Sequence, residues 1–263
     1  MRYVGLTALA AMVTGIILSP AVGTEILRND AVLVSDNYNT TASGGNDTLG
    51  AQPLADVGTW IVDEGTSGNI VTDAAIPGVQ EGDGYLKLLH DGAGGAQLKA
   101  KFDPITVVGD KFTWRSRAYF TGGGHDDDYQ FALRTTGTPT SPWYDDVIFT
   151  TTIRGGVVNA YDGSNYVPTG TTILTDQWTT WEVSYTRGAN TFSWLVNGVG
   201  DTAMPTIPGA SNKDIGFAMF FGNYTSSTDG GFPVCLDMVP EPTSALLLLG
   251  GVAGLAIRRR KTA

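Results

Sequence analysis

The sequence predicts an all-β fold in which two antiparallel sheets pack into a sandwich. Short runs of alternating or β-branched residues recur along the chain, and such runs are typical of half-buried strands. Clusters of Gly, Asn, Asp and Pro separate these runs, and glycine alone accounts for 35 of the 263 residues. Glycine adopts the backbone conformations that tight turns require, so this composition favours a fold with many turns. No long amphipathic helical stripe lies between the two termini, which favours packed antiparallel sheets over a βαβ arrangement.

The predicted strands follow the apolar runs in chain order. They are Ala31–Val34, Tyr85–Leu89, Gln97–Phe102, Phe112–Phe120, Tyr129–Arg134, Val147–Arg154, Val157–Tyr161, Thr179–Arg187, Thr191–Asn197, Ile215–Phe221 and Val234–Asp237. The dipeptide Asn197-Gly198 predicts a two-residue turn, because both residues tolerate a left-handed backbone. Residues 39–54, rich in Thr, Ser, Gly and Asn, are expected to form a loop.

The N-terminal residues 1–23 have the pattern of a secretory signal peptide. Arg2 supplies a positive charge, and an almost wholly apolar stretch runs from Val4 to Leu18. The small residues of Ala21-Val22-Gly23 then suit signal peptidase. We therefore expect a signal helix that is removed, leaving a mature chain that starts near Thr24. A buried first helix is the alternative.

The C-terminal residues 240–263 have three parts. Pro240, Glu241 and Pro242 precede an apolar run, Ala245–Ile257, which a basic cluster follows. As a helix the run would measure about 20 Å, against a hydrocarbon core of about 30 Å, so we expect a short and marginal transmembrane helix. Basic residues stay on the cytoplasmic side of a membrane, so the chain before Pro240 is expected outside.

This tail resembles the PEP-CTERM sorting signal of Gram-negative bacteria, through Pro240-Glu241-Pro242, the short apolar helix and the arginines Arg258, Arg259 and Arg260. The resemblance implies that the tail anchors the protein transiently in the inner membrane until an exosortase, a membrane cysteine protease, removes it. It also implies a final location at the cell surface or in the extracellular matrix, and a role connected with exopolysaccharide or biofilm. An ordinary C-terminal anchor is the alternative.

Two consecutive segments in the middle of the chain carry a second resemblance. In Gln177–Tyr185, Trp178 opens a strand with apolar alternation, and Asn190–Gly198 is a strand that ends in Asn-Gly. With the closing strand at Phe232–Met238, this order resembles the concanavalin A-like, laminin-G-like jelly roll. The resemblance implies that residues 24–239 form one such β-sandwich domain. A generic β-sandwich is the alternative.

The composition argues against some classes of function. The net charge is −10 at pH 7, and the exported part is more acidic still, because Arg2 and the basic tail lie outside it. Nucleic-acid binding is therefore not expected. Cys235 is the only cysteine, so no disulfide framework supports the fold, and the apolar residues beside it indicate a thiol in the core.

Catalytic residues of the resembled family are not found. Its hydrolases carry a Glu-x-Asp-x-x-Glu pattern on one strand, because glycoside hydrolysis requires two carboxyl groups close together. The glutamates of this chain are Glu25, Glu64, Glu81, Glu182 and Glu241, and no two are near enough in sequence to form this pattern. The histidines His90 and His125 also lack the Gln-x-His step of alginate lyases. We therefore expect a non-enzymatic protein. The alternatives are a hydrolase or lyase with a non-standard site at Glu182 or residues 126–128, and a purely structural or adhesive protein.

Alternation along two predicted strands suggests a glycan-binding face. In one strand the apolar positions leave Arg115, Arg117 and Tyr119 on the opposite face, and in the next they leave Gln130 and Arg134. If the two strands are neighbours in one sheet, the three arginines and Gln130 line a donor-rich face suited to a sugar or an anionic glycan. Arginines that pair with local aspartates on a solvated sheet are the alternative.

Aromatic residues in the predicted loops are further candidates for glycan binding. Trp143 and Tyr144, with Tyr161 and Tyr166, fall in or beside predicted loops, where they are candidates for stacking on sugar rings. Loop aromatics that only cover the edge of the sandwich are the alternative. The tryptophans on apolar strand faces are expected in the core; they are Trp114, Trp181 and Trp194.

A calcium site is the one cofactor that the sequence suggests. Calcium takes oxygen ligands from carboxylates and loop carbonyls, and domains of the resembled family often hold one such ion in rim loops. The candidate ligands are Asp126, Asp127, Asp128, Asp145 and Asp146. Solvated acidic turns are the alternative.

Overall fold

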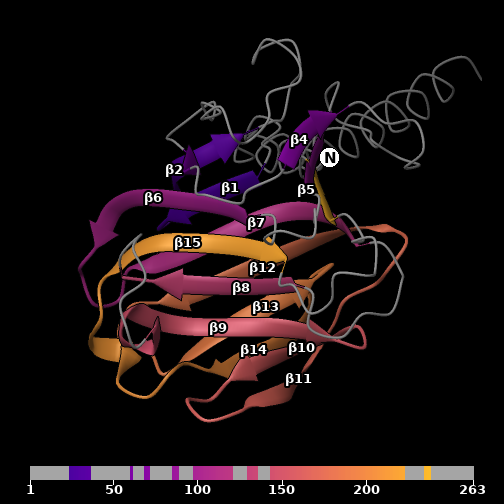
Figure 1. The fold of residues 1–263 in the computed structure, drawn as a ribbon. Helices are drawn as coiled ribbons and strands as arrows, with labels where there is room; N and C mark the ends of the chain where they lie inside the picture. Colours follow the sequence, from indigo (N-terminus) through magenta and orange to yellow (C-terminus); the bar gives the residue numbers. More distant parts are fainter. Residues whose placement is uncertain are drawn as a thin grey trace, which may run out of the picture. The chain divides into compact units, whose positions relative to one another are not determined.

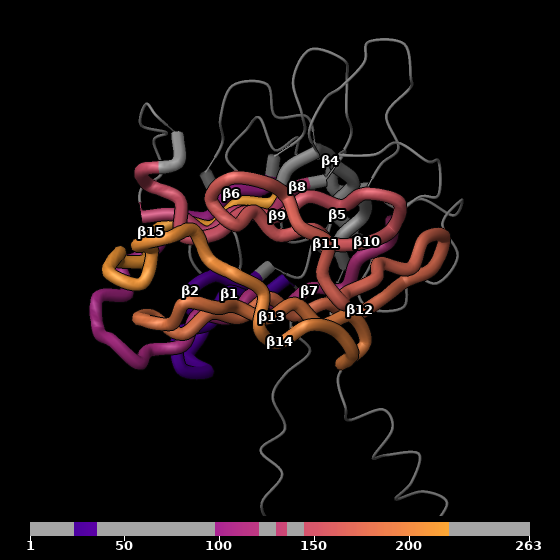
Figure 2. Tube along the Cα trace, turned by 90° about the horizontal axis from the view of Figure 1, so that it is seen from below, coloured from indigo at the N-terminus to yellow at the C-terminus, as the bar shows by residue number. Residues whose placement is uncertain are grey.

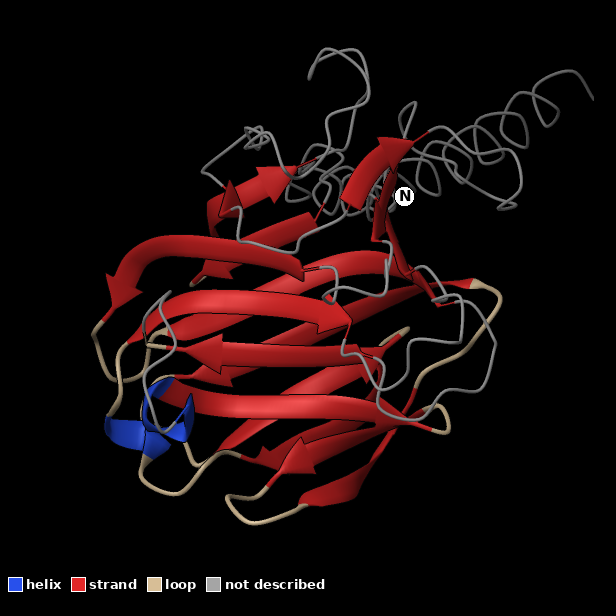
Figure 3. Cartoon of the chain, viewed as in Figure 1, coloured by secondary structure: helices blue, strands red, loops and turns tan. Residues whose placement is uncertain are grey.

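The computed structural model describes residues 24–36, 60–61, 68–71, 85–88, 97–120, 129–135, 143–222 and 234–237. These residues form sixteen strands arranged in two sheets (Figure 1). The sheets lie as two layers, one over the other (Figure 2). Strands dominate, and the helical segments among these residues are short (Figure 3). The prediction of an all-β sandwich of antiparallel sheets is therefore confirmed.

One sheet has nine strands, in the order β14-β13-β12-β7-β16-β5-β4, with β1 pairing to β7 and β2 pairing to β1. Their bounds are β1 Thr24–Arg28, β2 Ala31–Asp36, β4 Gly68–Val71, β5 Tyr85–Leu88, β7 Lys111–Phe120, β12 Trp178–Thr186, β13 Thr191–Val196, β14 Val199–Pro205 and β16 Val234–Asp237. The two-residue turn predicted at Asn197-Gly198 joins β13 to β14, and both residues have positive φ, 50° and 77°.

The other sheet has seven strands, in the order β11-β10-β9-β8-β15-β6-β3. Their bounds are β3 Trp60–Ile61, β6 Gln97–Ile105, β8 Tyr129–Arg134, β9 Val147–Arg154, β10 Val157–Tyr161, β11 Tyr166–Thr172 and β15 Ile215–Gly222. Two 3-10 helices, η2 Trp143–Asp146 and η3 Ala210–Asn212, precede β9 and β15.

Every predicted strand is present, and the strands that prediction missed are β1, β3, β4, β11 and β14. Four of these, β3, β4, β11 and β14, lie at the ends of the sheet orders. An edge strand has one neighbour, so it tolerates the proline and glycine that weaken a strand signal, as in β11. The segment 39–54, the signal helix and the C-terminal apolar helix lie outside the described residues. Among the helices that are described, none is long and apolar enough to cross a membrane.

Aromatic side chains fill the space between the sheets. Trp114, Trp181 and Trp194 come from β7, β12 and β13 and are fully buried, as predicted. Phe131, from β8 of the opposite sheet, meets them edge-on, at ring-centroid distances of 5.1, 5.9 and 5.9 Å. Phe149 stacks on Phe192 at 3.8 Å, again from one sheet to the other. Because such rings bury large areas and prefer edge-to-face or offset stacking, these contacts set how the sheets pack.

Strand β7 is paired along both of its edges. On one side β12 runs antiparallel to its whole length. On the other side β1 pairs with residues 112–115 and β16 pairs with residues 117–120, also antiparallel. Thr24 continues the β1 register opposite Ser116, and its Oγ1 lies 2.8 Å from Ser116 Oγ. Asp237, the last residue of β16, lies opposite Arg117, so β16 and β1 follow each other along β7 as one interrupted strand.

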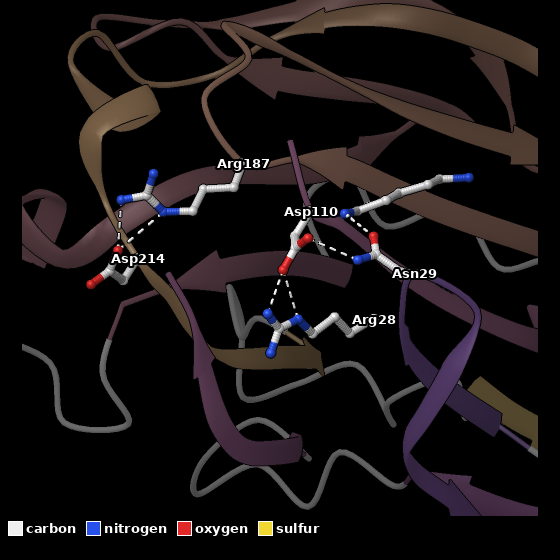
Figure 4. Close-up of polar contacts among 6 residues, drawn as sticks. Arg28, Asn29, Asp110, Arg187 and Asp214 are labelled. Atoms are coloured by element: carbon white, nitrogen blue, oxygen red, sulfur yellow. Dashed lines mark hydrogen bonds and ion pairs between the residues drawn. The ribbon is translucent and has the colours of Figure 1, made fainter. Parts of the chain in front are cut away.

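The β1–β2 turn is pinned to the start of β7 (Figure 4). Asn29 lies in this turn with a positive φ of 48°. Its side chain accepts a hydrogen bond from the Lys111 backbone N–H at 2.8 Å and donates one to Asp110 at 2.8 Å. Arg28 donates to the same Asp110 carboxylate through Nε at 2.7 Å and also through Nη2. Asp110 therefore adds side-chain contacts to the backbone pairing between β1 and β7.

The register of the interrupted strand can be tested by circular permutation. Joining Asp237 directly to Thr24, and opening the exposed turn between Ser164 and Asn165, should give a chain that folds into the same sandwich. One glycine inserted at the join should lower the urea midpoint, because it shifts one half of the strand out of register. Equal midpoints for the two permutants would contradict the continuous register.

The second prediction concerns Asp110. Its pKa is held below the ordinary value of 3.8 by the hydrogen bond from Asn29 and then by those from Arg28. A lowered pKa means that the contact stabilises the fold above about pH 4 and is lost as the pH falls through the folded-state pKa. Asp110→Asn should therefore lower the urea midpoint at pH 7, with a deficit that shrinks below pH 3.8. Asp214→Asn is the control, since its pair with Arg187 (Figure 4) has a carboxylate side chain 48% exposed and should matter less.

Candidate functional site

The outer face of the nine-stranded sheet carries a group of partly exposed aromatic and charged side chains. Alternation along β7 turns Phe112 and Trp114 inward and Arg115, Arg117 and Tyr119 outward, as predicted. Strand β12 alternates in the same way, because its buried positions are the odd-numbered ones from 179 to 185. Its outward residues therefore lie directly across from those of β7.

Three of these side chains form a compact cluster, Arg117, Tyr119 and Trp178, which we call the platform. Tyr119 lies opposite Trp178 in the register, and their rings meet at 5.6 Å with an interplanar angle of 61°. The guanidinium of Arg117 lies over the Trp178 ring, 5.2 Å from its centroid. Sugar-binding sites commonly combine the face of an aromatic ring with a neighbouring hydrogen-bond donor.

Arg115, one position along the same face, is held by carboxylates on both neighbouring strands. Its Nε donates to Glu182 Oε2 at 2.8 Å, and Glu25 lies opposite it on β1. Lys111 approaches the other oxygen of Glu182 at 3.9 Å. Burial raises the pKa of Glu25 above its ordinary 4.5, and the charge of Arg115 opposes this rise. Arg115 and Glu182 therefore neutralise each other beside the platform.

The prediction that Arg115, Arg117, Gln130 and Arg134 share one face is wrong. It required β7 and β8 to be neighbours, but β7 belongs to the nine-stranded sheet and β8 to the seven-stranded sheet. Alternation along a strand shows which residues share a face. It does not show which strands are neighbours, because pairing depends on contacts far apart in the chain.

Arg134 is buried, with 6% of its surface exposed. Its Nη2 donates to both oxygens of Asp146, at 2.7 and 2.8 Å. Breaking a buried ion pair of this kind costs free energy, because removal of either partner leaves the other as an uncompensated buried charge. The pair links β8 to η2, so Arg134 supports the fold. Arg134 therefore fits the alternative given in the sequence analysis, in which an arginine pairs with a local aspartate.

Gln130 lies on the outer face of the seven-stranded sheet, in register with Thr152 on β9, which in turn lies opposite Asn159 on β10. Gln130 is partly exposed, whereas Thr152 and Asn159 are only 1% and 6% exposed. The same sheet carries a second aromatic group, in which Tyr161 and Tyr166 lie 5.2 Å apart and Arg154 stands 5.5 Å from the Tyr166 ring.

The calcium prediction has less support in the described residues. Asp146 is engaged by Arg134, and Asp145 is exposed. In the part of the chain that the structure describes, no group of three or more His, Cys, Asp or Glu could hold a metal ion. Asp126, Asp127 and Asp128 lie outside the described residues, as do the side chains of Trp143 and Tyr144. Calcium therefore stays a prediction.

Sequence reasoning placed Tyr119 on the correct face but did not include Trp178 in the site. The signal was present, because Trp178 is in phase with Thr180 and Glu182, which are also partly exposed, and out of phase with the buried Trp181. Only the pairing of β12 with β7 places Trp178 opposite Tyr119.

Comparison with protein families matches the PEP-CTERM protein-sorting motif to residues 239–261. This confirms the interpretation of the tail, whose residues Pro240, Glu241, Pro242 and Arg258 to Arg260 lie outside the described residues. The motif implies export, a membrane-anchored sorting tail and processing of the exosortase type.

No curated protein matches the sequence. Among solved structures, the chain is similar to a sialidase at 14% identity and a TM-score of 0.42, over 65% of this chain and 16% of that one. It is similar to lectin I-B4 from Griffonia simplicifolia at 14% identity and a TM-score of 0.40, over 65% and 89%. It is also similar to alginate lyase A1-II′ at 14% identity and a TM-score of 0.42, over 64% and 79%. Identities and TM-scores at this level carry no property of those proteins over to this chain.

The raised pKa of Glu25 gives a test of the site's electrostatics. The folded protein holds this proton more tightly than the unfolded chain, so stability should fall as the pH rises from 4.5 through the folded-state pKa. Glu25→Gln should therefore raise the urea midpoint at pH 7 and change little at pH 4. Glu182→Gln, which removes the other partner of Arg115, should lower stability by about 0–1 kcal/mol. A loss of stability at pH 7 for Glu25→Gln would show that attraction to Arg115 outweighs burial.

Proposed function

We propose that this protein is a non-enzymatic component of the cell surface or extracellular matrix that binds polysaccharide. The observation that carries the proposal is the platform on the outer face of the nine-stranded sheet. There the partly exposed ring of Trp178 lies 5.6 Å from Tyr119 and 5.2 Å from the guanidinium of Arg117. The C–H faces of a sugar stack on such rings, and the guanidinium donates hydrogen bonds to hydroxyl or carboxylate oxygens.

The sorting tail supports the location proposed for this function. A PEP-CTERM motif implies export and exosortase-type processing, and the resemblance drawn from the sequence connects such tails with exopolysaccharide and biofilm. After removal of the tail, we expect the sandwich to lie at the cell surface or in the matrix, where polysaccharide is the abundant ligand.

The contacts of Glu182, which lies beside the platform, favour binding over hydrolysis. Glu182, the candidate catalytic carboxylate, is committed to Arg115 at 2.8 Å and has Lys111 nearby. A catalytic carboxylate must reach the substrate, whereas cationic side chains of the protein itself approach both oxygens of Glu182.

Affinity electrophoresis through gels that contain a neutral polymer such as dextran, or an anionic polymer such as alginate, tests the proposal. Trp178→Ala should weaken retention by about 2- to 13-fold, which corresponds to the loss of a stacking contact of about 0.5–1.5 kcal/mol. Tyr166→Ala removes a partly exposed ring that also lies beside an arginine, on the other sheet, and should leave retention unchanged.

Other outcomes would point to the alternatives. Release of reducing ends or unsaturated sugars, abolished by Glu182→Gln, would indicate an enzyme. Retention that requires calcium and is lost with a chelator would support the calcium site. No retention on any polymer by the folded protein would favour a purely structural or adhesive role.

A further inference from the structure

Residues with carboxyl groups lie on both sides of Arg117, the cation of the platform. Glu182 on β12 and Glu25 on β1 are both in register with Arg115, the outward residue that precedes Arg117 on β7. Each of them is therefore a diagonal neighbour of Arg117, and such neighbours lie about 7–8 Å apart, within reach of long side chains. On the part of the same edge that β16 occupies, Asp237 lies directly opposite Arg117 in the register.

The other cations of β7 are close to a carboxylate as well. Arg115 donates to Glu182 Oε2 at 2.8 Å, and the ammonium of Lys111 lies 3.9 Å from Glu182 Oε1. The side chain of Glu182 is 28% exposed, so a ligand that approaches this face of the sheet meets its charge. The three cationic residues of β7 are thus matched by three acidic residues of its neighbours, Glu182, Glu25 and Asp237.

This balance of charge affects neutral and anionic sugars differently. Stacking on Trp178 and Tyr119 requires the apolar C–H face of a sugar and no charge, and the guanidinium of Arg117 donates to hydroxyl oxygens as well as to anions. A uronate or sulfate group at Arg117 would lie near Glu182, and two like charges about 8 Å apart in water repel enough to weaken binding about twofold. The net charge of the chain, −10 at pH 7, acts in the same direction.

We propose that the platform selects uncharged polysaccharide, and that Glu182 is a specificity-determining residue that disfavours anionic chains. This inference rests on the proposed function, because it concerns the ligand of the same site. Glu182 neutralises Arg115 and presents a negative charge to solvent next to the platform. Glu25 contributes less, because only 8% of its surface is exposed.

Affinity electrophoresis of the full chain in two pairs of polymers tests the selectivity. The pairs are dextran with carboxymethyl dextran, and hydroxyethyl cellulose with carboxymethyl cellulose, so that the members of a pair share a backbone and differ in charge. At low ionic strength the neutral member of a pair that binds should retain the protein at least about twofold more strongly than the charged member. The difference should shrink as added salt screens the charges.

Glu182→Gln tests whether this residue is responsible. It should raise retention on the carboxymethyl polymer, relative to the neutral one, by at least about twofold, because a negative charge is lost and Arg115 loses this partner. Asp214→Asn is the matched control. It also removes a carboxylate paired with an arginine, 2.6 Å from Arg187, but Asp214 directly precedes β15 of the other sheet. The ratio of the two retentions should therefore stay as in the unchanged protein.

Two results would overturn the selectivity and leave the proposed function standing. One is retention on a carboxymethyl polymer that equals or exceeds retention on its neutral counterpart. The other is an equal change of the ratio in Glu182→Gln and Asp214→Asn, which would assign the preference to the overall charge of the chain. No retention on any of the four polymers by the folded protein would instead contradict the proposed function, and the selectivity with it.

Discussion

The described structure depends on strand β7 being paired along both edges. β12 covers one edge completely, and the other is divided between the first strand of the sandwich and the last. The inward side chains of β7 include Trp114, which meets Phe131 of the opposite sheet. Its outward side chains include Arg115, Arg117 and Tyr119. The buried core, the platform, and the place where the first and last strands of the sandwich meet are therefore all built on β7.

The pairing of β7 with its neighbours explains the position of the platform. A residue on the outer face of a sheet gains neighbours only from adjacent strands. For β7 these neighbours are β12, which brings Trp178 and Glu182, β1, which brings Glu25, and β16, whose Cys235 and Asp237 lie opposite Tyr119 and Arg117. Arg115 donates to Glu182, and the guanidinium of Arg117 lies over the Trp178 ring.

The divided edge of β7 also connects the fold to the export of the protein. The PEP-CTERM motif follows β16 almost immediately, so the domain and its sorting tail share a junction instead of being separated by a long linker.

The sequence by itself determined the fold class, the sorting tail and, in strands such as β7 and β12, the face on which each residue lies. These features follow from local patterns. The alternation in β7 and β12, the Asn197-Gly198 turn and the Pro-Glu-Pro motif with its apolar run can each be recognised within a few residues. The burial of Trp114, Trp181 and Trp194 followed from the same alternation.

Only the tertiary structure decided which strands are neighbours. It separated Arg115 and Arg117 from Gln130 and Arg134, gave Arg134 to Asp146, and brought Trp178 to Tyr119 from a strand far along the chain. It also placed Thr24 next in register to Asp237. Strand pairing is set by contacts between distant segments, and a strand's pattern is the same whichever neighbour it has. The candidate binding site is a product of this pairing, so it could not be predicted from the sequence alone.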